Sequence, residues 1–155
     1  MEEKDYTLIF VLNREKKRIL LGMKKRGFGV NKYNGYGGKV EMNESILQGA
    51  IRELEEESGL KVADLNRVGY IVFHMEESQK IMKVHVYTYD EKEELTPIET
   101  DEMRPQWFGF DEIPFDRMWP DDPYWLPLLL QGKKFIGRFD YSDDNTIIDH
   151  TLKEQ

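Results

Sequence analysis

Four glutamates fall within five consecutive residues of the segment RELEEESG: Glu53, Glu55, Glu56 and Glu57. In a helix, the first, third and fourth of them stand at positions i, i+3 and i+4 and share one side, while Glu55 points elsewhere. Because like charges at this spacing repel each other, such a run is either a solvated face or a site that expects a cation. Carboxylates without histidine or cysteine favour a hard cation such as Mg²⁺, with Mn²⁺ as a substitute.

The residues around this run predict a helix that ends where the glutamates end. Ser45, with Gln48 three residues later, fits a capping box at its start, and Gly59 fits a C-terminal cap. The apolar side of this helix is expected to face the core and consists of Leu47, Ala50, Ile51 and Leu54.

Two further residues of the same helix bear on the glutamates. Gly49 shares their side, where glycine costs about 1 kcal/mol relative to alanine, and we interpret the missing side chain as space for a ligand. Arg52 lies next to Glu53 and four residues before Glu56. It is expected to orient both glutamates by charge-assisted hydrogen bonds.

Composition limits the classes of protein to which the chain can belong. Its 155 residues fit one domain, residues 1–155, with 39% hydrophobic residues. A formal charge of −8 argues against binding to a nucleic-acid polymer, although a small anionic ligand remains compatible if local cations reverse the sign. The absence of cysteine excludes disulfides, thiolate metal sites and a cysteine nucleophile. Without a targeting segment or a membrane-spanning run, a cytoplasmic protein without membrane contact is expected.

Apolar runs alternate with turn-forming stretches along the whole chain. Strands are predicted at residues 6–12, 18–23, 67–75, 81–90, 104–110, 135–141 and 146–152. A second helix is predicted at WPDDPYWLPLLLQ, residues 119–131, and KKRGFGVNKYNGYGGK, with five glycines in sixteen residues, predicts an irregular loop. Mixed strands with two helices indicate an α+β or α/β domain.

The glutamate segment resembles, position for position, the signature of the Nudix hydrolases, G-x5-E-x7-R-E-U-x-E-E-x-G-U, in which U is a bulky aliphatic residue. The matching positions are Gly38, Glu44, Arg52, Glu53, Leu54, Glu56, Glu57, Gly59 and Leu60. The resemblance implies an α/β/α sandwich around a mixed sheet. It also implies an enzyme that cleaves a nucleoside diphosphate linked to another group.

Stretches outside the signature narrow this resemblance. LLGMKKRGFG, NGYGGKV, DEMRPQWF and MWPDDPYWLPLLLQ are similar to the animal MutT-homologue enzymes, and the similarity runs from Tyr6 to about Leu152. These enzymes hydrolyse oxidised purine nucleoside triphosphates, such as 8-oxo-dGTP and 2-hydroxy-dATP, to monophosphate and pyrophosphate, so that polymerases cannot incorporate them. The resemblance thus implies Mg²⁺-dependent sanitisation of the nucleotide pool by a monomer in the cytoplasm. Action on the mitochondrial or nuclear nucleotide pool is also compatible with the resemblance.

Matched by position, this resemblance also assigns site residues. The metal ligands would be the Gly37 carbonyl, Glu53, Glu56, Glu57 and Glu102. Lys24 would face the phosphates, and Asn34, Asp121 and Asp122 would read the edge of the base. The base pocket would be lined by Thr7, Leu8, Phe28, Phe73, Met82, Met103, Trp119 and Trp125.

Several of these assignments have simpler alternatives. Phe73, Met82 and Trp125 could be ordinary core residues, and Asp121 with Asp122 could cap the following helix. If the two aspartates instead read the base, close packing raises one pKa and leaves a protonated donor beside an ionised acceptor. One pocket could then accept oxidised guanine and oxidised adenine.

The expected chemistry is attack of water on a phosphorus of the triphosphate, with Glu53 as the first choice of general base, Glu56 as the second and Glu57 mainly as ligand. Tyr33 and Met75 depart from the mammalian pattern near the pocket, so the preference among oxidised guanine, oxidised adenine and methylated purines stays open. Two other readings compete. One is a Nudix enzyme for another nucleoside diphosphate derivative, and the other is a catalytically silent module that only binds a nucleotide or a protein partner.

Overall fold

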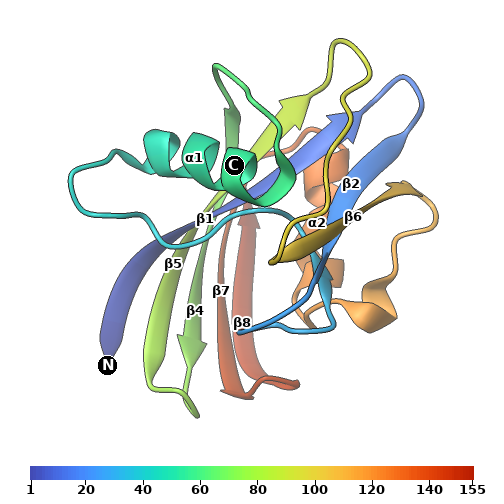
Figure 1. Cartoon of the computed structure of the whole chain (residues 1–155). Coiled ribbons are helices and arrows are strands. Elements are labelled where there is room, and N and C mark those ends of the chain that lie inside the picture. The colour runs from blue at the N-terminus through green and yellow to red at the C-terminus, as the bar shows by residue number, and fades with distance from the viewer.

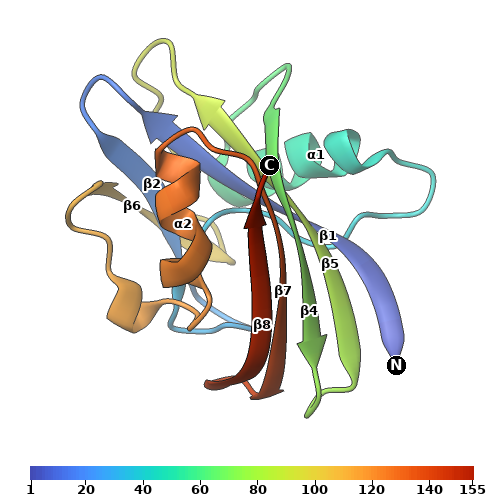
Figure 2. The ribbon, with the colours of Figure 1, turned by 180° about the vertical axis from the view of Figure 1, so that it is seen from behind.

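One mixed β-sheet, with a helix on each face, carries the whole architecture (Figures 1 and 2). The computed structural model describes residues 1–155. The sheet has eight strands in the order β3-β2-β1-β5-β4-β7-β8, and β6 pairs with β2 outside this path. The pairs β1–β5 and β4–β7 are parallel and the others antiparallel. The predicted α/β/α sandwich around a mixed sheet is confirmed.

Every strand predicted from the sequence is present. The strands are β1 Glu2–Asn13, β2 Arg18–Lys24, β3 Tyr33–Asn34, β4 Asn66–Met75, β5 Lys80–Asp90, β6 Met103–Gly109, β7 Phe135–Asp143 and β8 Thr146–Glu154. Strand β1 begins four residues before the predicted start at Tyr6, because its polar first residues pair with β5 from Glu2 opposite Lys80 onwards. The two-residue strand β3 was not predicted, since it exists only through its pairing with β2.

Strand β1 divides the apolar interior into two cores, because successive side chains of a strand point to opposite faces. Phe10 and Leu12 belong to the core on the side of the second helix, whereas Ile9 and Val11 belong to the core under the first helix. All four are fully buried. A central strand buried on both faces therefore anchors both helices.

Helix α1 spans Ile46–Ser58 and has the predicted caps. The Ser45 side chain accepts a hydrogen bond from the Gln48 amide, the Gln48 side chain reciprocates, and Gly59 ends the helix at φ 77°. Of the predicted core side, Ala50 and Leu54 are fully buried, while Leu47 and Ile51 are partly buried.

The interpretation of Gly49 as space for a ligand is wrong. A Cβ atom at this position would lie 2.9 Å from Oε1 of Glu44. The glycine therefore makes room for a side chain of the protein itself, which also accepts hydrogen bonds from Arg52.

Helix α2 spans Asp122–Leu130 and follows a short 3₁₀ turn at Phe115–Arg117. It begins three residues later than the predicted 119, so that Trp119 and Asp121 lie in the connection that leads into it. Neither α1 nor α2 is long and apolar enough to cross a membrane.

Candidate active site

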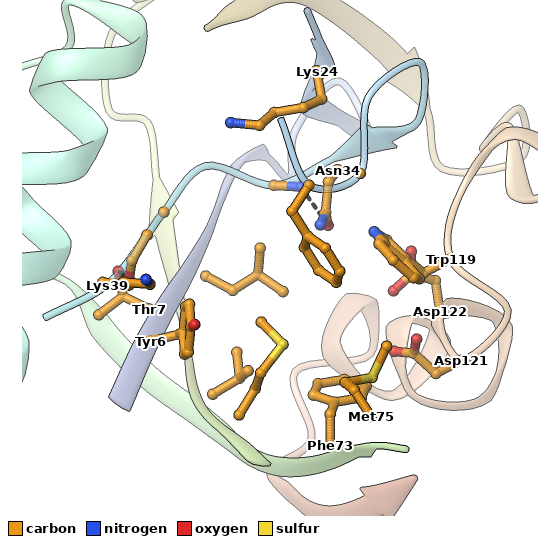
Figure 3. A pocket seen from close by; sticks show the side chains of 18 of the residues that line it. Tyr6, Thr7, Lys24, Asn34, Lys39, Phe73, Met75, Trp119, Asp121 and Asp122 are labelled. Atoms are coloured by element: carbon orange, nitrogen blue, oxygen red, sulfur yellow. Dashed lines mark hydrogen bonds between the residues drawn. The ribbon is translucent and has the colours of Figure 1, made fainter. Parts of the chain in front are cut away.

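One pocket, with a volume of about 280 Å³, opens between β1, the ends of β4 and β5, the glycine-rich loop and the start of α2 (Figure 3). This volume lies near the lower end for small-molecule sites. All of the residues that the sequence assigned to substrate binding line it: Thr7, Leu8, Lys24, Phe28, Asn34, Phe73, Met82, Met103, Trp119, Asp121, Asp122 and Trp125. Of the residues assigned to the metal, Gly37 and Glu57 also line the pocket, whereas Glu53, Glu56 and Glu102 lie outside its lining.

Asp121 is held at the closed end of the pocket by two hydrogen bonds. Nε1 of Trp125 donates to its Oδ2 at 2.7 Å, and the Tyr141 hydroxyl donates to its Oδ1. Asp121 occupies the N-cap position of α2, but its side chain makes no capping hydrogen bond. The alternative that Asp121 caps the helix is therefore wrong.

Asp122 is equally buried and differs from its neighbour in one respect. Its Oδ2 atom has no hydrogen-bond partner in the protein. Burial and the adjacent charge of Asp121 raise the pKa of Asp122 well above its ordinary value, and burial also raises the pKa of Asp121. The pair therefore combines Asp121, whose oxygens accept two hydrogen bonds, with Asp122, whose protonated form is favoured and whose Oδ2 atom has no partner.

The aromatic residues of the pocket divide between core and rim. Trp125 is fully buried and packs against Phe10 and Phe135, with ring centroids 5.8 and 5.5 Å away, so it is a core residue whose indole nitrogen also fixes Asp121. Phe28 is 43% exposed and stacks on Trp119 at 4.9 Å. A flat ring that enters the pocket would meet this pair at its rim.

Asn34 supplies a further polar group to the pocket wall (Figure 3). Its Oδ1 accepts a hydrogen bond of 2.8 Å from the Gly35 amide. This contact fixes the orientation of the side chain and leaves the amide nitrogen as a donor toward a ligand.

The glycine-rich loop joins the pocket to the glutamates of α1. Backbone hydrogen bonds tie it to β1, among them Thr7 N to Gly38 O at 2.9 Å. Gly37 has φ 154°, and a Cβ there would lie 1.9 Å from the Thr7 carbonyl oxygen. The Gly37 amide donates to Glu57 Oε1 at 3.1 Å. Only glycine permits this approach, which places the loop backbone against Glu57.

Arg52 orients the other glutamates, as the sequence predicted. Its Nη1 atom lies 3.0 Å from Glu53 Oε1 and 3.2 Å from Glu56 Oε2. Its Nε and Nη2 atoms bind Glu44, which holds the pKa of that carboxyl at about 2. Arg52 therefore fixes one edge of the acidic cluster through every nitrogen of its guanidinium group.

The acidic side chains differ in burial and therefore in pKa. Burial raises the pKa of Glu57 to about 7, and burial also raises that of Glu53 against the opposing effect of Arg52. Glu56 is more than half exposed. A cation beside the Glu57 or Glu53 carboxylate would make the buried, ionised form of that side chain more favourable.

Glu102 comes from a different part of the chain, immediately before β6. Lys24 Nζ lies 2.8 Å from its Oε2 atom and Arg26 Nε lies 2.7 Å from its Oε1 atom. These two hydrogen bonds lower the pKa of Glu102 below its usual value.

No group of three or more acidic or histidine side chains is arranged closely enough to hold a metal ion in this structure. In this arrangement Arg52, the Gly37 amide, Lys24 and Arg26 each hold one or more of the carboxylates. The donor set nevertheless fits a hard divalent cation, because it is all oxygen and because a cation would offset the cost of burying the Glu53 and Glu57 carboxylates. The ligand assignments therefore stay predictions.

Eight residues that sequence reasoning did not assign to the site also line the pocket: Tyr6, Gly29, Gly35, Gly38, Lys39, Met75, Val84 and Tyr141. Tyr6 lies two residues before Leu8 in β1 and therefore points to the same face of the strand. This two-residue period could have identified Tyr6 as a pocket residue. Tyr141 lies twenty residues beyond Asp121 and reaches it only because β7 pairs with β4. No sequence signal indicates that contact.

Comparison with known proteins identifies the family to which this chain belongs. Residues 3–129 match the model of the NUDIX domain. The chain belongs to the Nudix family. The Nudix chain is 54% identical over 149 residues to a mouse protein named oxidized purine nucleoside triphosphate hydrolase, with 96% of this chain and 94% of the mouse protein covered. It is 50% identical to a zebrafish (Danio rerio) protein of the same name, over 95% of this chain and 94% of the relative.

Solved structures agree with the Nudix fold. The crystal structure of a mutator MutT protein from Bacillus halodurans superposes with a TM-score of 0.82 at 24% identity, over 97% of each chain. A MutT NUDIX hydrolase from Burkholderia pseudomallei superposes with a TM-score of 0.66 over 74% of this chain and 88% of its own. At these identities the likeness supports the Nudix fold alone.

Proposed function

We propose that this Nudix protein hydrolyses oxidised purine nucleoside triphosphates, such as 8-oxo-dGTP and 2-hydroxy-dATP, to nucleoside monophosphate and pyrophosphate. In this role it removes mutagenic precursors from the nucleotide pool. The observation that carries the proposal is the buried pair Asp121 and Asp122 at the closed end of an aromatic pocket that leads to the glutamates of α1. The names of the mouse and zebrafish relatives support it.

The pair of aspartates suits an oxidised base because oxidation changes which purine atoms donate and which accept hydrogen bonds. Asp122 donates its proton and offers a free oxygen, while Asn34 offers its amide nitrogen as a second donor. Phe28 and Trp119 would cover the face of the ring. A reader with both donors and acceptors can bind oxidised guanine and oxidised adenine in one pocket.

The other end of the pocket suits a phosphate chain. Lys24 lines this end and balances phosphate charge, and Lys39 lines the pocket from the glycine-rich loop. Glu53, Glu56, Glu57, Glu102 and the Gly37 carbonyl would hold a divalent cation, for which we propose Mg²⁺ with Mn²⁺ as a substitute. The cation would neutralise phosphate charge and make water more acidic. Glu53 would accept the proton of the attacking water, with Glu56 as the second choice.

We further propose that the protein acts as a monomer in the cytoplasm and that its partners are small nucleotides rather than nucleic-acid polymers. Its formal charge of −8 supports this choice, since a polyanion would be repelled by most of its surface. Binding of a short triphosphate requires only that the cations at one end of the pocket be in place.

The decisive experiment is incubation with Mg²⁺ and, separately, 8-oxo-dGTP, 2-hydroxy-dATP, dGTP and dATP, with all phosphate products resolved. We expect monophosphate and pyrophosphate, formed faster from the two oxidised nucleotides. Equal rates on all four would refute the sanitising role and leave Nudix chemistry on another nucleotide. No hydrolysis of any would refute the proposed function.

The aspartates are tested by Asp122→Asn, which keeps the shape of the side chain and removes its titratable proton. The ratio of kcat/KM for 8-oxo-dGTP to that for 2-hydroxy-dATP is expected to change by about tenfold, the size of one buried hydrogen bond. Asp116→Asn makes the same substitution at an exposed position in the 3₁₀ turn and should leave the ratio unchanged. Identical ratios in all three proteins would refute the assignment of Asp122.

A further inference from the structure

Arg26 makes a contact that the assigned site does not explain. Its Nε atom binds Oε1 of Glu102 at 2.7 Å, while Lys24 binds the other oxygen of the same carboxylate at 2.8 Å. The Lys25 amide also donates to the Glu102 carbonyl at 2.8 Å, which fixes the two chain segments side by side. One carboxylate is thus held between two cations.

The guanidinium group of Arg26 is only partly used. Nε makes its single hydrogen bond, and neither Nη atom has a partner within the protein. Arg52, by contrast, uses all three of its nitrogens in contacts with Glu44, Glu53, Glu56 and the Lys39 carbonyl. Arg52 is therefore saturated, whereas Arg26 retains the paired N–H donors that match a phosphate group.

Arg26 also has room to move. Its side chain is 64% exposed, against 24% for Lys24. The next residue, Gly27, has φ 79°, and no atom lies within 4 Å of the place where its Cβ would stand. Exposed ion pairs contribute little to stability. Breaking the ion pair between Glu102 and Arg26 therefore costs less free energy than breaking the one between Glu102 and Lys24.

We propose that Arg26 is a phosphate-binding residue. Glu102 holds Arg26 until the Glu102 carboxylate binds a divalent cation. The two cations beside Glu102 repel a third, so release of one of them favours binding of a metal ion by this carboxylate. The released guanidinium group lies beside Lys24, which lines the phosphate end of the pocket. Glu102 then exchanges Arg26 for the metal, and Arg26 exchanges Glu102 for the phosphate chain. The inference rests on the proposed function for the identity of that chain.

Two titrations of Arg26→Gln test the exchange without turnover. In the first, Mn²⁺ alone is added and the free ion is followed by electron paramagnetic resonance. We expect the variant to bind Mn²⁺ about two- to five-fold more tightly, since Glu102 has lost a competitor worth an exposed ion pair. In the second, inorganic tripolyphosphate is titrated in excess Mg²⁺ by calorimetry, and binding is expected to weaken about tenfold.

Lys25→Gln is the matched control. Lys25 carries the same charge on the neighbouring residue, but its Nζ atom binds Glu99 and the Thr100 carbonyl rather than Glu102. Lys25→Gln should show only the general effect of one lost positive charge. In both titrations this effect should be smaller than the effect of Arg26→Gln. Arg26→Lys keeps the charge and loses the paired donors, so its tripolyphosphate affinity should fall between those of wild type and Arg26→Gln.

The opposite signs of the two effects distinguish the exchange from a structural role. Weaker binding of both Mn²⁺ and tripolyphosphate by Arg26→Gln would overturn the proposal, and so would changes no larger than those of Lys25→Gln. Neither titration uses a base or measures hydrolysis. If the wild-type protein hydrolyses none of the four nucleotides, the proposed function fails, and the two titrations still decide the role of Arg26.

Discussion

Three carboxylates of this Nudix protein are buried where a charge is costly. Glu57, Asp121 and Asp122 are 7%, 3% and 2% exposed. Glu57 receives one backbone hydrogen bond, Asp121 receives two side-chain hydrogen bonds, and Oδ2 of Asp122 receives none. A core built for stability alone would not contain them. Their positions at the two ends of one pocket account for their presence.

Asp122 should leave a signature in the pH dependence of stability. Burial and Asp121 raise its pKa above the ordinary 3.8, with Lys32 as the opposing charge. The folded state therefore binds this proton more tightly than the unfolded chain does. Consequently, the free energy of unfolding contributed by Asp122 falls as the pH rises from about 4 to the raised pKa, by at most about 1.4 kcal/mol per pH unit.

Urea unfolding of wild type and Asp122→Asn across this pH range measures that contribution. The variant cannot titrate at this position, so the difference in free energy between the two proteins should move in favour of the variant as the pH rises. The Asp121 carboxyl and the Tyr141 hydroxyl face the same space and are present in both proteins. A difference independent of pH would contradict the raised pKa of Asp122.

Glu57→Gln should separate stability from activity. The amide can still accept the hydrogen bond from Gly37, but it carries no charge to bury. At pH 8, above the pKa of about 7, the metal-free variant is expected to have a higher Tm than wild type. Turnover should fall by about 100-fold or more, because Glu57 is one of the metal ligands that we propose. A lower Tm together with full turnover would contradict both assignments.

At the scale of elements, α1 and the glycine-rich loop work as one unit. The capping box sets where α1 begins, and the loop approaches Glu57 through Gly37 and Glu53 through Gly38, where a Cβ would lie 2.8 Å from the Glu53 carboxyl carbon. The glutamates are therefore positioned from two sides, by helix geometry and by a backbone that lacks side chains. Either element alone would leave them free to move apart.

Loss of the cap should weaken this unit without destroying it. Ser45→Ala removes the hydrogen bond to the Gln48 amide and should lower the free energy of unfolding by about 1 kcal/mol. Turnover at 25 °C should stay within about twofold, because packing of Ala50 and Leu54 still fixes the helix. Ser78→Ala, at an exposed turn, is the control and should change neither quantity measurably.

At the scale of the whole molecule, we expect the fold to form without a metal ion. Both cores are complete around β1, and Glu53 and Glu102 are already paired with Arg52, Lys24 and Arg26. The sheet and the helices therefore form a scaffold on which the ion acts as a ligand only.

Removal of divalent cations by EDTA should accordingly abolish hydrolysis and leave the far-ultraviolet circular dichroism spectrum unchanged. Addition of Mg²⁺ should raise Tm by only a few degrees, since a ligand that binds the folded state stabilises it according to its affinity. Loss of the folded spectrum in EDTA would show that the ion is structural and would contradict this arrangement.

The sequence by itself determined seven of the eight strands, both helices, the caps of α1 and the family. It did so because apolar periodicity, Ser45, Gln48 and Gly59 act locally, and because the signature has fixed spacing within one helix and its preceding loop. It also named most of the residues that line the pocket, through resemblance. Only the tertiary structure decided what each of them contacts. Tyr141 holds Asp121 and Arg26 holds Glu102, because strand pairing brings together residues that lie far apart in the chain. Glu44 fills the space at Gly49, where Arg52 holds its carboxylate.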